Sequence, residues 1–490
     1  MIYSQYTDFF GEIGGAPVGL LVNSITGAVD LIAGTIYRAW AQHSAPETFS
    51  ESVRSRFLQR GHFYTGTAVL EQQFLASVSA ALHEKAVAEA TNAFWIIPTY
   101  RCNLRCAYCF QDHALHEGGT PATRDMTSAD AIDLVDLLDQ YGGIGRRPER
   151  PRYITLFGGE PLMRSVGETV RTLVDRARKK GYKISAVTNG VELEHFADVL
   201  GPDLIRWVQI TLDGVQRSHE KRRSSCGAPS FEAIVRGIDL ALSQGVKVSL
   251  RTNVDRKLLD ELAGMDEWVK ARGWTAFKNF RWYTSGVEVH NNPSLKKVAA
   301  TTADLVSNWS GLRTIAARPP YVGKHAATLR KLRQRGISER IETSACGAHT
   351  GMMFFDPLGD VYACAEQAGQ VEFAVGNWRN HTLGPSALPW ASRHVGASPI
   401  CSRCSNAFFC GGGCANAAMQ NGGDFFGPRC NGIKDAIDFA SRDFARNLLS
   451  DAVIARELEA HGSFSVNDDS IVLSSESVDI FVARASCAPL

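Results

Sequence analysis

This chain of 490 residues carries almost no net charge, because 52 Lys and Arg residues balance 51 Asp and Glu residues to a formal charge of +1. That balance argues against binding to nucleic acid or to an anionic membrane surface. The uncharged stretch over residues 13–29 is too short, and too rich in Gly, Asn and Ser, to span a bilayer. The first residues lack the basic region and apolar core of a signal peptide. These absences predict a cytoplasmic protein without a nucleic-acid or membrane partner.

Internal repeats and low-complexity segments are also missing from the sequence. The hydrophobic content of 44% and the charged content of 21% are typical of a soluble globular protein. A chain of this length exceeds what one hydrophobic core usually supports, so we expect two or three domains.

Cysteines, in contrast, are plentiful. Ten of the twelve fall into two dense groups, whereas Cys226 and Cys487 stand apart and are expected to be incidental thiols. In a large chain without an export signal, clustered thiols favour metal ligation over disulfide bonds. The cysteine usage therefore also fits a reducing cytoplasm.

The first group is the segment Cys102-Asn-Leu-Arg-Cys106-Ala-Tyr-Cys109-Phe110, which follows an apolar run at residues 94–97. Three thiolates are one too few for a closed structural zinc site. They are the right number to hold three irons of a 4Fe-4S cube and to leave the fourth iron open to a small molecule. The spacing therefore indicates redox chemistry, with a fragment of a zinc site as the alternative.

Cys-x3-Cys-x2-Cys followed by an aromatic residue resembles the signature of the radical S-adenosylmethionine (SAM) superfamily. The resemblance implies that Cys102, Cys106 and Cys109 hold a catalytic 4Fe-4S cluster whose open iron chelates SAM. It further implies that electron transfer cleaves SAM to a 5′-deoxyadenosyl radical, which abstracts a hydrogen atom from the substrate. Tyr108, inside the motif, is an expected SAM contact.

Gly158-Gly159-Glu160 follows the second predicted strand and matches the superfamily's GGE motif, which binds the amino group of SAM. Glycines permit a close approach of the backbone to a ligand, and a carboxylate can accept from an ammonium group. A tight turn with a surface Glu is the alternative.

Three further SAM or substrate contacts are expected at strand ends, namely Asn189, Asp213 and Arg251. Asn-Gly and Asp-Gly also form turns without any ligand. Arg251 is expected to meet the SAM carboxylate through a charge-assisted bond. The charged segment at residues 219–223 also resembles a superfamily pattern, although a solvated loop explains it nearly as well.

The second cysteine group resembles the SPASM extension of radical SAM maturases. The resemblance implies two auxiliary 4Fe-4S clusters, and thus three clusters in all. One would be ligated by Cys401, Cys404, Cys410 and Cys430, and the other by Cys346, Cys364 and Cys414. The second set is one ligand short, because Met352 stands where some relatives have a further cysteine. Either a non-cysteine group completes that cluster or one iron is open; two zinc sites are the alternative.

Short apolar runs alternate with helical patterns from about residue 93 to 285, which predicts repeated βα units. The expected strands are 94–97, 153–157, 183–188, 207–212, 246–254 and 277–283. Helices are expected from Thr127 or Ser128 onward and over residues 165–180, 231–244 and 258–271. This order fits an α/β fold with the partial (β/α)6 TIM-type barrel of the radical SAM superfamily, and ligands of such barrels lie at the carboxyl ends of the strands.

The remaining segments flank this barrel. Residues 1–90 read as a small α/β unit with a strand at 18–22 and helices at 28–40 and 51–59, and their order resembles winged-helix domains that capture leader peptides. A purely structural extension is the alternative. We expect bridging helices at 291–340, and a helix after about residue 441 followed by a β-like run at 478–483. The expected domains are 1–90, 91–290, 291–345, 346–440 and 441–490.

These features predict a radical SAM maturase that acts on a peptide or small protein and installs a thioether or carbon–carbon crosslink or another oxidation. An electron donor such as flavodoxin or ferredoxin is an expected partner. Sulfatase-maturating relatives have an Asp that serves as a base directly after the cysteine aligned with Cys364. Here Glu366, one position further along, is the candidate catalytic base. Ala365 at the position of that Asp argues against a sulfatase substrate. An oxidase or epimerase of a small molecule or sugar and a formylglycine-forming maturase are alternatives, and a non-enzymatic metal-binding protein is the least favoured.

Overall fold

The computed structural model describes residues 1–90, 93–111, 124–141, 151–225, 229–287, 299–300, 304–305, 325, 328–329, 331, 342–420, 423–430 and 432–466. The chain forms two compact units. The first comprises residues 1–86, 321–346 and 393–490, and the second comprises residues 87–320 and 347–392. The five-part division expected from the sequence stays a prediction. Within the described ranges, no helix has the length and hydropathy needed to cross a membrane.

The second unit is built around six parallel strands that lie side by side in chain order. They are β6 (Ala93–Ile96), β8 (Arg152–Leu156), β9 (Tyr182–Thr188), β10 (Ile205–Thr211), β12 (Lys247–Val254) and β13 (Phe280–Gly286). All six strands predicted from the apolar runs are confirmed. Their carboxyl ends therefore meet at one edge of the sheet, where the expected site residues follow.

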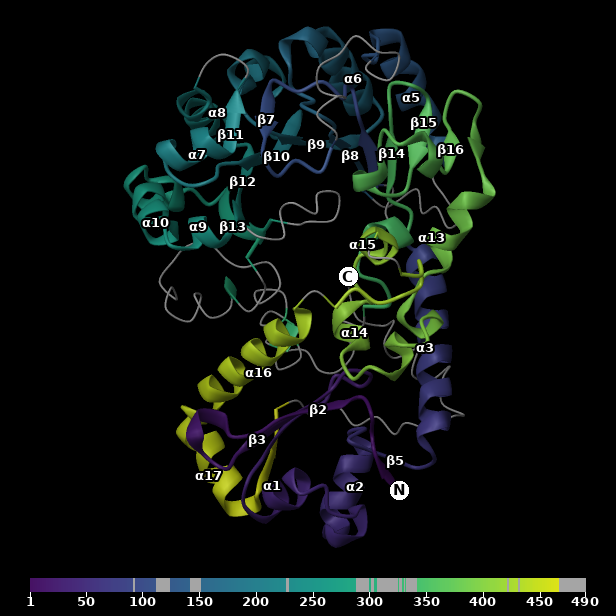
Figure 1. Cartoon of the computed structure of the whole chain (residues 1–490), viewed down its shortest axis with the longest axis vertical. Helices are drawn as coiled ribbons and strands as arrows, with labels where there is room; N and C mark the ends of the chain where they lie inside the picture. Colours follow the sequence, from purple (N-terminus) through teal and green to yellow (C-terminus); the bar gives the residue numbers. More distant parts are fainter. Residues whose placement is uncertain are drawn as a thin grey trace. The chain divides into compact units, whose positions relative to one another are not determined.

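Helices connect these strands and cover the outer face of the sheet (Figure 1). Their amphipathic patterns explain this arrangement, since α6 buries Val170, Leu173, Val174 and Ala177 at helical spacing. The helices are α5 (Ser128–Tyr141), α6 (Gly167–Lys179), α7 (Gln216–Arg222), α8 (Phe231–Ser243), α9 (Arg256–Leu259) and α10 (Leu262–Ala271). The unit is thus an α/β fold with a partial barrel. A two-stranded antiparallel ribbon of β7 (Leu104–Cys106) and β11 (Arg223–Ser225) stands apart from the sheet.

A short antiparallel extension continues the sheet beyond β6. It consists of β14 (Met353–Phe355), β15 (Asp360–Tyr362), β16 (Gly376–Asn377) and β17 (Thr382–Leu383), and α13 (Leu388–Ser392) follows. A turn at residues 356–359 follows β14, and Asp356 Oδ1 closes it by accepting from the backbone N–H groups of Leu358, Gly359 and Asp360 at 2.8–3.0 Å. Since β14 pairs in parallel with β6, residues 353–355 lie beside the first barrel strand.

The first unit contains a four-stranded antiparallel sheet in the order β18-β4-β3-β2. Helices α1 and α2 pack on one face, and α16 and α17 pack on the other (Figure 1). The bounds are β1 (Ile2–Tyr3), β2 (Thr7–Phe10), β3 (Gly19–Asn23), β4 (Val29–Ile32), α1 (Gly34–Ala41), α2 (Glu51–Gln59), β5 (Phe63–Tyr64), α3 (Ala68–Ala88), α14 (Ala407–Cys410), α15 (Ala415–Gln420), α16 (Ile433–Leu449), α17 (Ala452–His461) and β18 (Ser463–Ser465).

The predicted helix at residues 28–40 is wrong in its first half, because β4 is a strand and α1 begins only at Gly34. The sheet is covered on both faces, so all four residues of β4 are buried. A strand buried on both faces shows a continuous apolar run instead of an alternating one, and such a run cannot be told from a buried helix by its pattern. The left-handed backbone of Gly34, with φ of +57°, separates the strand from the helix.

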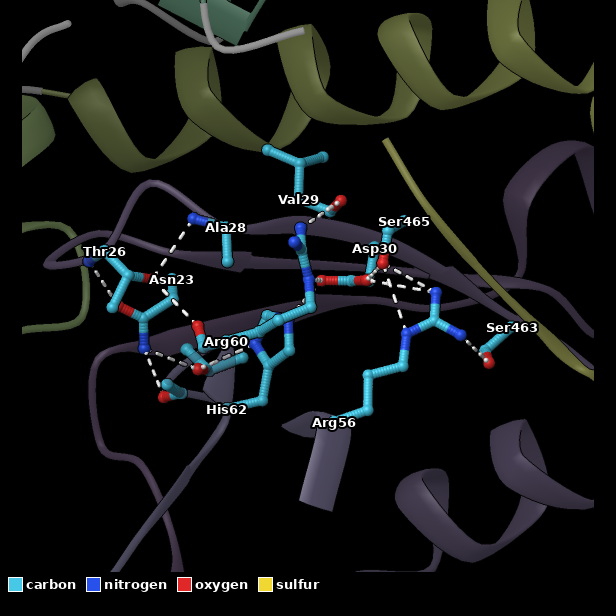
Figure 2. A network of polar contacts seen from close by, with 12 residues as sticks. Asn23, Thr26, Ala28, Val29, Asp30, Arg56, Arg60, His62, Ser463 and Ser465 are labelled. Carbon is cyan, nitrogen blue, oxygen red and sulfur yellow. Dashed lines mark hydrogen bonds and ion pairs between the residues drawn. The ribbon is translucent and has the colours of Figure 1, made fainter. Parts of the chain in front are cut away.

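A buried ionic network joins the C-terminal strand β18 to this sheet (Figure 2). Asp30, on β4, is fully buried and accepts from Arg60 Nε at 2.5 Å and from Ser465 Oγ at 2.7 Å, and it lies 2.7 Å from His62 Nε2. Arg56 adds bonds to the hydroxyls of Ser463 and Ser465. Burial alone would raise the pKa of Asp30, but the bonds and charges of His62 and Arg60 outweigh it and lower the pKa to about 2.

The C-terminal part of the first unit departs from the sequence prediction in one respect. Two helices, α16 and α17, precede β18, where we expected one helix after about residue 441. The predicted strand at residues 478–483 and most of the predicted bridging helices at 291–340 lie outside the described residues. Cys226 and Cys487 lie outside them as well.

Candidate active site

The loop with the first three cysteines follows β6 and is held by β11. Cys106 pairs with Arg223 across the β7–β11 ribbon. The three thiols share one neighbourhood, because the charges of Cys106 and Cys109 both act on Cys102. Burial, with the nearby charge of Glu160, raises the pKa of the Cys102 thiol to about 12. A nearby cation favours the thiolate form of such a thiol.

The Gly158–Glu160 loop lies directly against the chain that leads into the cysteine loop. The backbone N–H groups of Gly159 and Glu160 donate to the carbonyls of Thr99 and Arg101 at 3.1 and 2.8 Å. A Cβ atom on Gly159 would lie 2.2 Å from the Tyr100 carbonyl oxygen. The glycines are thus required for a close approach of two protein segments, and this packing brings Glu160 beside the cysteines.

Glu160 is 2% exposed and is held by donors from two loops. Its Oε1 accepts from the Leu162 N–H at 2.8 Å and from the Thr188 hydroxyl at 2.6 Å, and its Oε2 accepts from the Asn189 N–H at 2.5 Å. Burial raises the pKa of Glu160 to about 7, although these three bonds oppose the shift. The side-chain amide of Asn189 in turn lies 3.8 Å from Cys102 Sγ.

Tyr108 of the cysteine loop, which is partly buried, pairs with the fully buried Asp213. The Tyr108 hydroxyl donates to Asp213 and accepts from Arg223 at 2.7 Å. Asp213 is fully buried, and its second oxygen accepts from the Asn253 N–H at 2.8 Å. The side chain of Asp213 therefore orients Tyr108, and the contact of Asp213 with a ligand stays a prediction.

A cavity of about 440 Å³ opens at the carboxyl ends of the strands and contacts nearly all of these groups. Two carboxylates, Glu160 and Glu366, and two guanidinium groups, Arg223 and Arg251, line it. Arg251 is oriented by Asn253 at 2.8 Å and by Ser285 at 3.3 Å. Charges of both signs on one wall suit a zwitterion such as an amino acid group. The lining residues that the sequence analysis named include Cys102, Cys106, Tyr108, Cys109, Gly158, Gly159, Glu160, Asn189, Arg251, Met352 and Glu366.

Another part of the cavity wall is apolar. Trp95 and Phe354 lie 5.2 Å apart between ring centroids, and Phe157 lies 5.6 Å from Phe354. Glu366, in a short turn after Cys364, places a carboxylate in the same cavity. The pairing of β14 with β6 explains this proximity, since it carries residues 352–366 to the barrel.

Four of the cysteines in the second group converge in the first unit. The charges of Cys401, Cys430 and Cys404 all act on Cys410, whose pKa burial raises to about 11. The intervening glycines allow the chain to wrap tightly, because a Cβ atom on Gly413, where φ is +74°, would lie 2.1 Å from the Arg429 carbonyl oxygen. These are the four thiols that the sequence analysis assigned to one auxiliary cluster.

The other three predicted ligands are divided between the two units. Cys346 and Cys414 belong to the first unit, and Cys364 follows β15 in the second. Among the residues that the structure describes, no three His, Cys, Asp or Glu side chains surround a single-ion site. The spacing of the thiols and their shared neighbourhoods are therefore what indicates iron–sulfur clusters.

Comparison with known proteins agrees with this geometry. A family model described as the radical SAM superfamily matches residues 96–268, which include the first three cysteines and Glu160. The chain contains a radical SAM domain. Proteins with this domain bind a 4Fe-4S cluster and SAM, which suits the three thiols and the mixed charges of the cavity.

The similarity to known proteins extends beyond the radical SAM domain. Over 350 residues the chain is 28% identical to the mycofactocin maturase MftC of Mycolicibacterium smegmatis, a match that covers 67% of this chain and 79% of that protein. The Fe-coproporphyrin III synthase of Methanosarcina barkeri is 29% identical over 32% of this chain and 36% of its own length. The structure of native anSMEcpe with bound AdoMet has a TM-score of 0.55 at 17% identity, covering 72% of this chain and 97% of that one, and it shows the same fold.

Sequence analysis missed one feature of the radical SAM domain, namely the role of Arg223. In the sequence, residues 219–223 fit both a superfamily pattern and a solvated loop. Arg223 is 6% exposed, pairs with Cys106 and lines the cavity. The sequence gives only a weak signal for Arg223, because a run of Lys and Arg is typical of an exposed helix end. Only the β7–β11 pairing shows which residue of this run turns inward.

Proposed function

We propose that this protein is a radical SAM maturase that removes a hydrogen atom from a peptide or small protein and thereby installs a crosslink or another oxidation. The observation that carries the proposal is one cavity lined by three cysteines, by Glu160 and by two arginines. When bound, a 4Fe-4S cluster with SAM supplies a 5′-deoxyadenosyl radical. The protein's own residues bind SAM, orient the substrate and exclude water.

In this proposal Glu160 accepts from the ammonium group of SAM, because it lines the cavity and its charge acts on Cys102. Arg223 and Arg251 are the candidates for the SAM carboxylate. Tyr108 is positioned by Asp213, which fixes the cysteine loop from behind. Glu366, at the apolar part of the cavity, is the candidate base that takes a proton from the oxidised substrate.

We further propose that the protein holds three 4Fe-4S clusters. The radical cluster would use Cys102, Cys106 and Cys109. The first auxiliary cluster would use Cys401, Cys404, Cys410 and Cys430. The second auxiliary cluster, with Cys346, Cys364 and Cys414, has three cysteine ligands. The auxiliary clusters would accept an electron from the substrate radical, and flavodoxin or ferredoxin would reduce the radical cluster.

The peptide substrate is supported by the relatives. The match to mycofactocin maturase MftC covers 67% of this chain, about twice the share matched by Fe-coproporphyrin III synthase. One structure with a TM-score of 0.53 is native anSMEcpe with AdoMet and the Cp18Cys peptide, although at 16% identity it shows only the fold. We therefore favour a peptide over a small molecule or sugar.

The radical chemistry is tested with Cys106→Ala. Anaerobically reconstituted protein is reduced with dithionite, and 5′-deoxyadenosine is measured. We expect the variant to release none while it retains auxiliary iron, and we expect the control Cys226→Ala to behave as the wild type. Wild-type turnover in Cys106→Ala would exclude this cluster as the radical source. The substrate class is tested by mass spectrometry of a short peptide encoded beside this gene, where a crosslink appears as the loss of two hydrogens.

A further inference from the structure

Arg393 is a buried cation inside the auxiliary cysteine region. It follows α13 and begins the C-terminal segment of the first unit. Its side chain is 3% exposed. The guanidinium donates to backbone carbonyls of two loops, as follows: Nε to Phe425 at 2.8 Å, Nη1 to Gly413 at 3.0 Å, and Nη2 to Gly412 at 3.2 Å and to Gly427 at 3.0 Å.

The acceptors of Arg393 lie beside the predicted cluster ligands. Gly412 and Gly413 stand between Cys410 and Cys414, and Phe425 and Gly427 shortly precede Cys430. One side chain therefore ties together the two loops that present three of the thiols. Arg is suited to this task because its planar fork offers five donors in a fixed geometry.

The charge of Arg393 also acts on the thiols themselves. A Cβ atom placed on Gly412 would lie 3.6 Å from Cys401 Sγ and 3.8 Å from Arg393 Nη2, so the sulfur and the guanidinium flank the same glycine. Burial lowers the pKa of Arg393, and the charges of Cys401, Cys414, Cys410 and Cys346 oppose that shift. The guanidinium thus lies within electrostatic range of both predicted ligand sets.

A fixed cation beside an iron–sulfur cluster has a predictable effect. Reduction adds negative charge to the cluster, and a nearby positive charge in a low-dielectric interior stabilises the reduced form more than the oxidised form. A buried guanidinium is costly by itself and becomes favourable when an anion neutralises it. An iron cube with four thiolate ligands is such an anion.

We propose that Arg393 is a positioning residue that braces the two loops around the auxiliary cluster of Cys401, Cys404, Cys410 and Cys430 and raises the reduction potential of that cluster. This inference rests on the proposed function, because it requires that the four thiols hold a cluster. A raised potential suits a cluster that accepts the electron left on the substrate after hydrogen abstraction.

The test uses the full-length protein with Cys102, Cys106 and Cys109 all replaced by Ala, so that auxiliary clusters alone contribute iron and EPR signal. Arg393→Gln, Arg393→Lys and the control Arg403→Gln are compared in this parent. Arg403 is an exposed arginine between Cys401 and Cys404, so the control removes a charge that stands between two of the predicted ligands. Iron content and the midpoint potential from an EPR-monitored redox titration are measured for each.

We expect Arg393→Gln to shift the midpoint potential to a more negative value or to lose iron, and Arg403→Gln to match the parent. If Arg393→Lys retains iron and the parent's midpoint potential, the positive charge of Arg393 causes the effect. If both Arg393 variants lose iron, the hydrogen bonds of the guanidinium to the two loops cause it. Unchanged iron and potential in both Arg393 variants would overturn the inference. A parent without auxiliary iron would instead refute the cluster assignment in the proposed function.

Discussion

Replacing Glu160 with Gln preserves the size of the side chain and removes its negative charge. In the structure three protein donors already bind the two carboxylate oxygens, from Leu162, Thr188 and Asn189. A carboxylate has about four acceptor positions, so about one remains for the ammonium group of SAM. The substitution therefore removes one charge-assisted bond to the cofactor.

The size of the effect follows from that single bond. A hydrogen bond to a charged group contributes about 1.5–3 kcal/mol. Because 1.4 kcal/mol corresponds to a tenfold change, the dissociation constant of SAM should rise about 10- to 100-fold. The Gln amide also replaces one acceptor oxygen with a donor, so circular dichroism and iron content must show that the variant remains folded and loaded.

The assay is anaerobic calorimetry of SAM binding to reconstituted protein. Glu168→Gln is the matched control, because Glu168 is an exposed carboxylate at the start of α6 in the same unit, and we expect its affinity to equal that of the wild type. If folded, iron-loaded Glu160→Gln binds SAM as tightly as the wild type, Glu160 does not contact the ammonium group.

The pH dependence provides a second check on the same carboxylate. Burial raises the pKa of Glu160 to about 7, and only the ionised form provides the negative charge for the SAM ammonium group. The affinity of the wild type should therefore fall as the pH drops below about 7, by about tenfold per pH unit, until it reaches the affinity of the Gln variant. The Gln variant has no carboxylate and should lack this dependence.

Three other predictions concern buried charges. Asp30→Ala leaves the buried cation Arg60 without its anion, so thermal unfolding should show a loss of about 3–5 kcal/mol, whereas exposed Asp435→Ala should change little. Burial lowers the pKa of His62 below 6.5, so His62 binds a proton more readily in the unfolded chain than in the folded one. The free energy of unfolding should therefore decline as the pH drops through about 6.5, and it should decline less in His62→Gln. Arg223→Gln removes a charge-assisted bond, so calorimetry should show SAM binding that is about 10- to 100-fold weaker. The control is exposed Arg217→Gln, and equal SAM binding by the two variants would contradict the role of Arg223.

Much of the barrel and of its site was predictable because the signals are local. Each strand of the parallel sheet is a short apolar run, and each turn or helix that follows it is near in sequence. The three cysteines lie within eight residues on one loop, so their spacing alone indicates a cluster with an open iron. Glu160 follows a predicted strand, and parallel strands bring their carboxyl ends to one edge regardless of the details of packing.

Tertiary structure decided the features that depend on distant pairing. The pattern of β4 did not reveal a strand, because helices cover both faces of its sheet and remove the alternation that identifies one. Arg223 became a site residue only through its pairing with Cys106, more than a hundred residues earlier. Asp30, in β4, is buried and ionised because Arg60 and His62 lie against it and Ser465 reaches it from β18. Hydrophobic pattern and motif spacing are properties of neighbouring residues, whereas the burial of a charge depends on which distant groups meet it, and only the folded chain determines that.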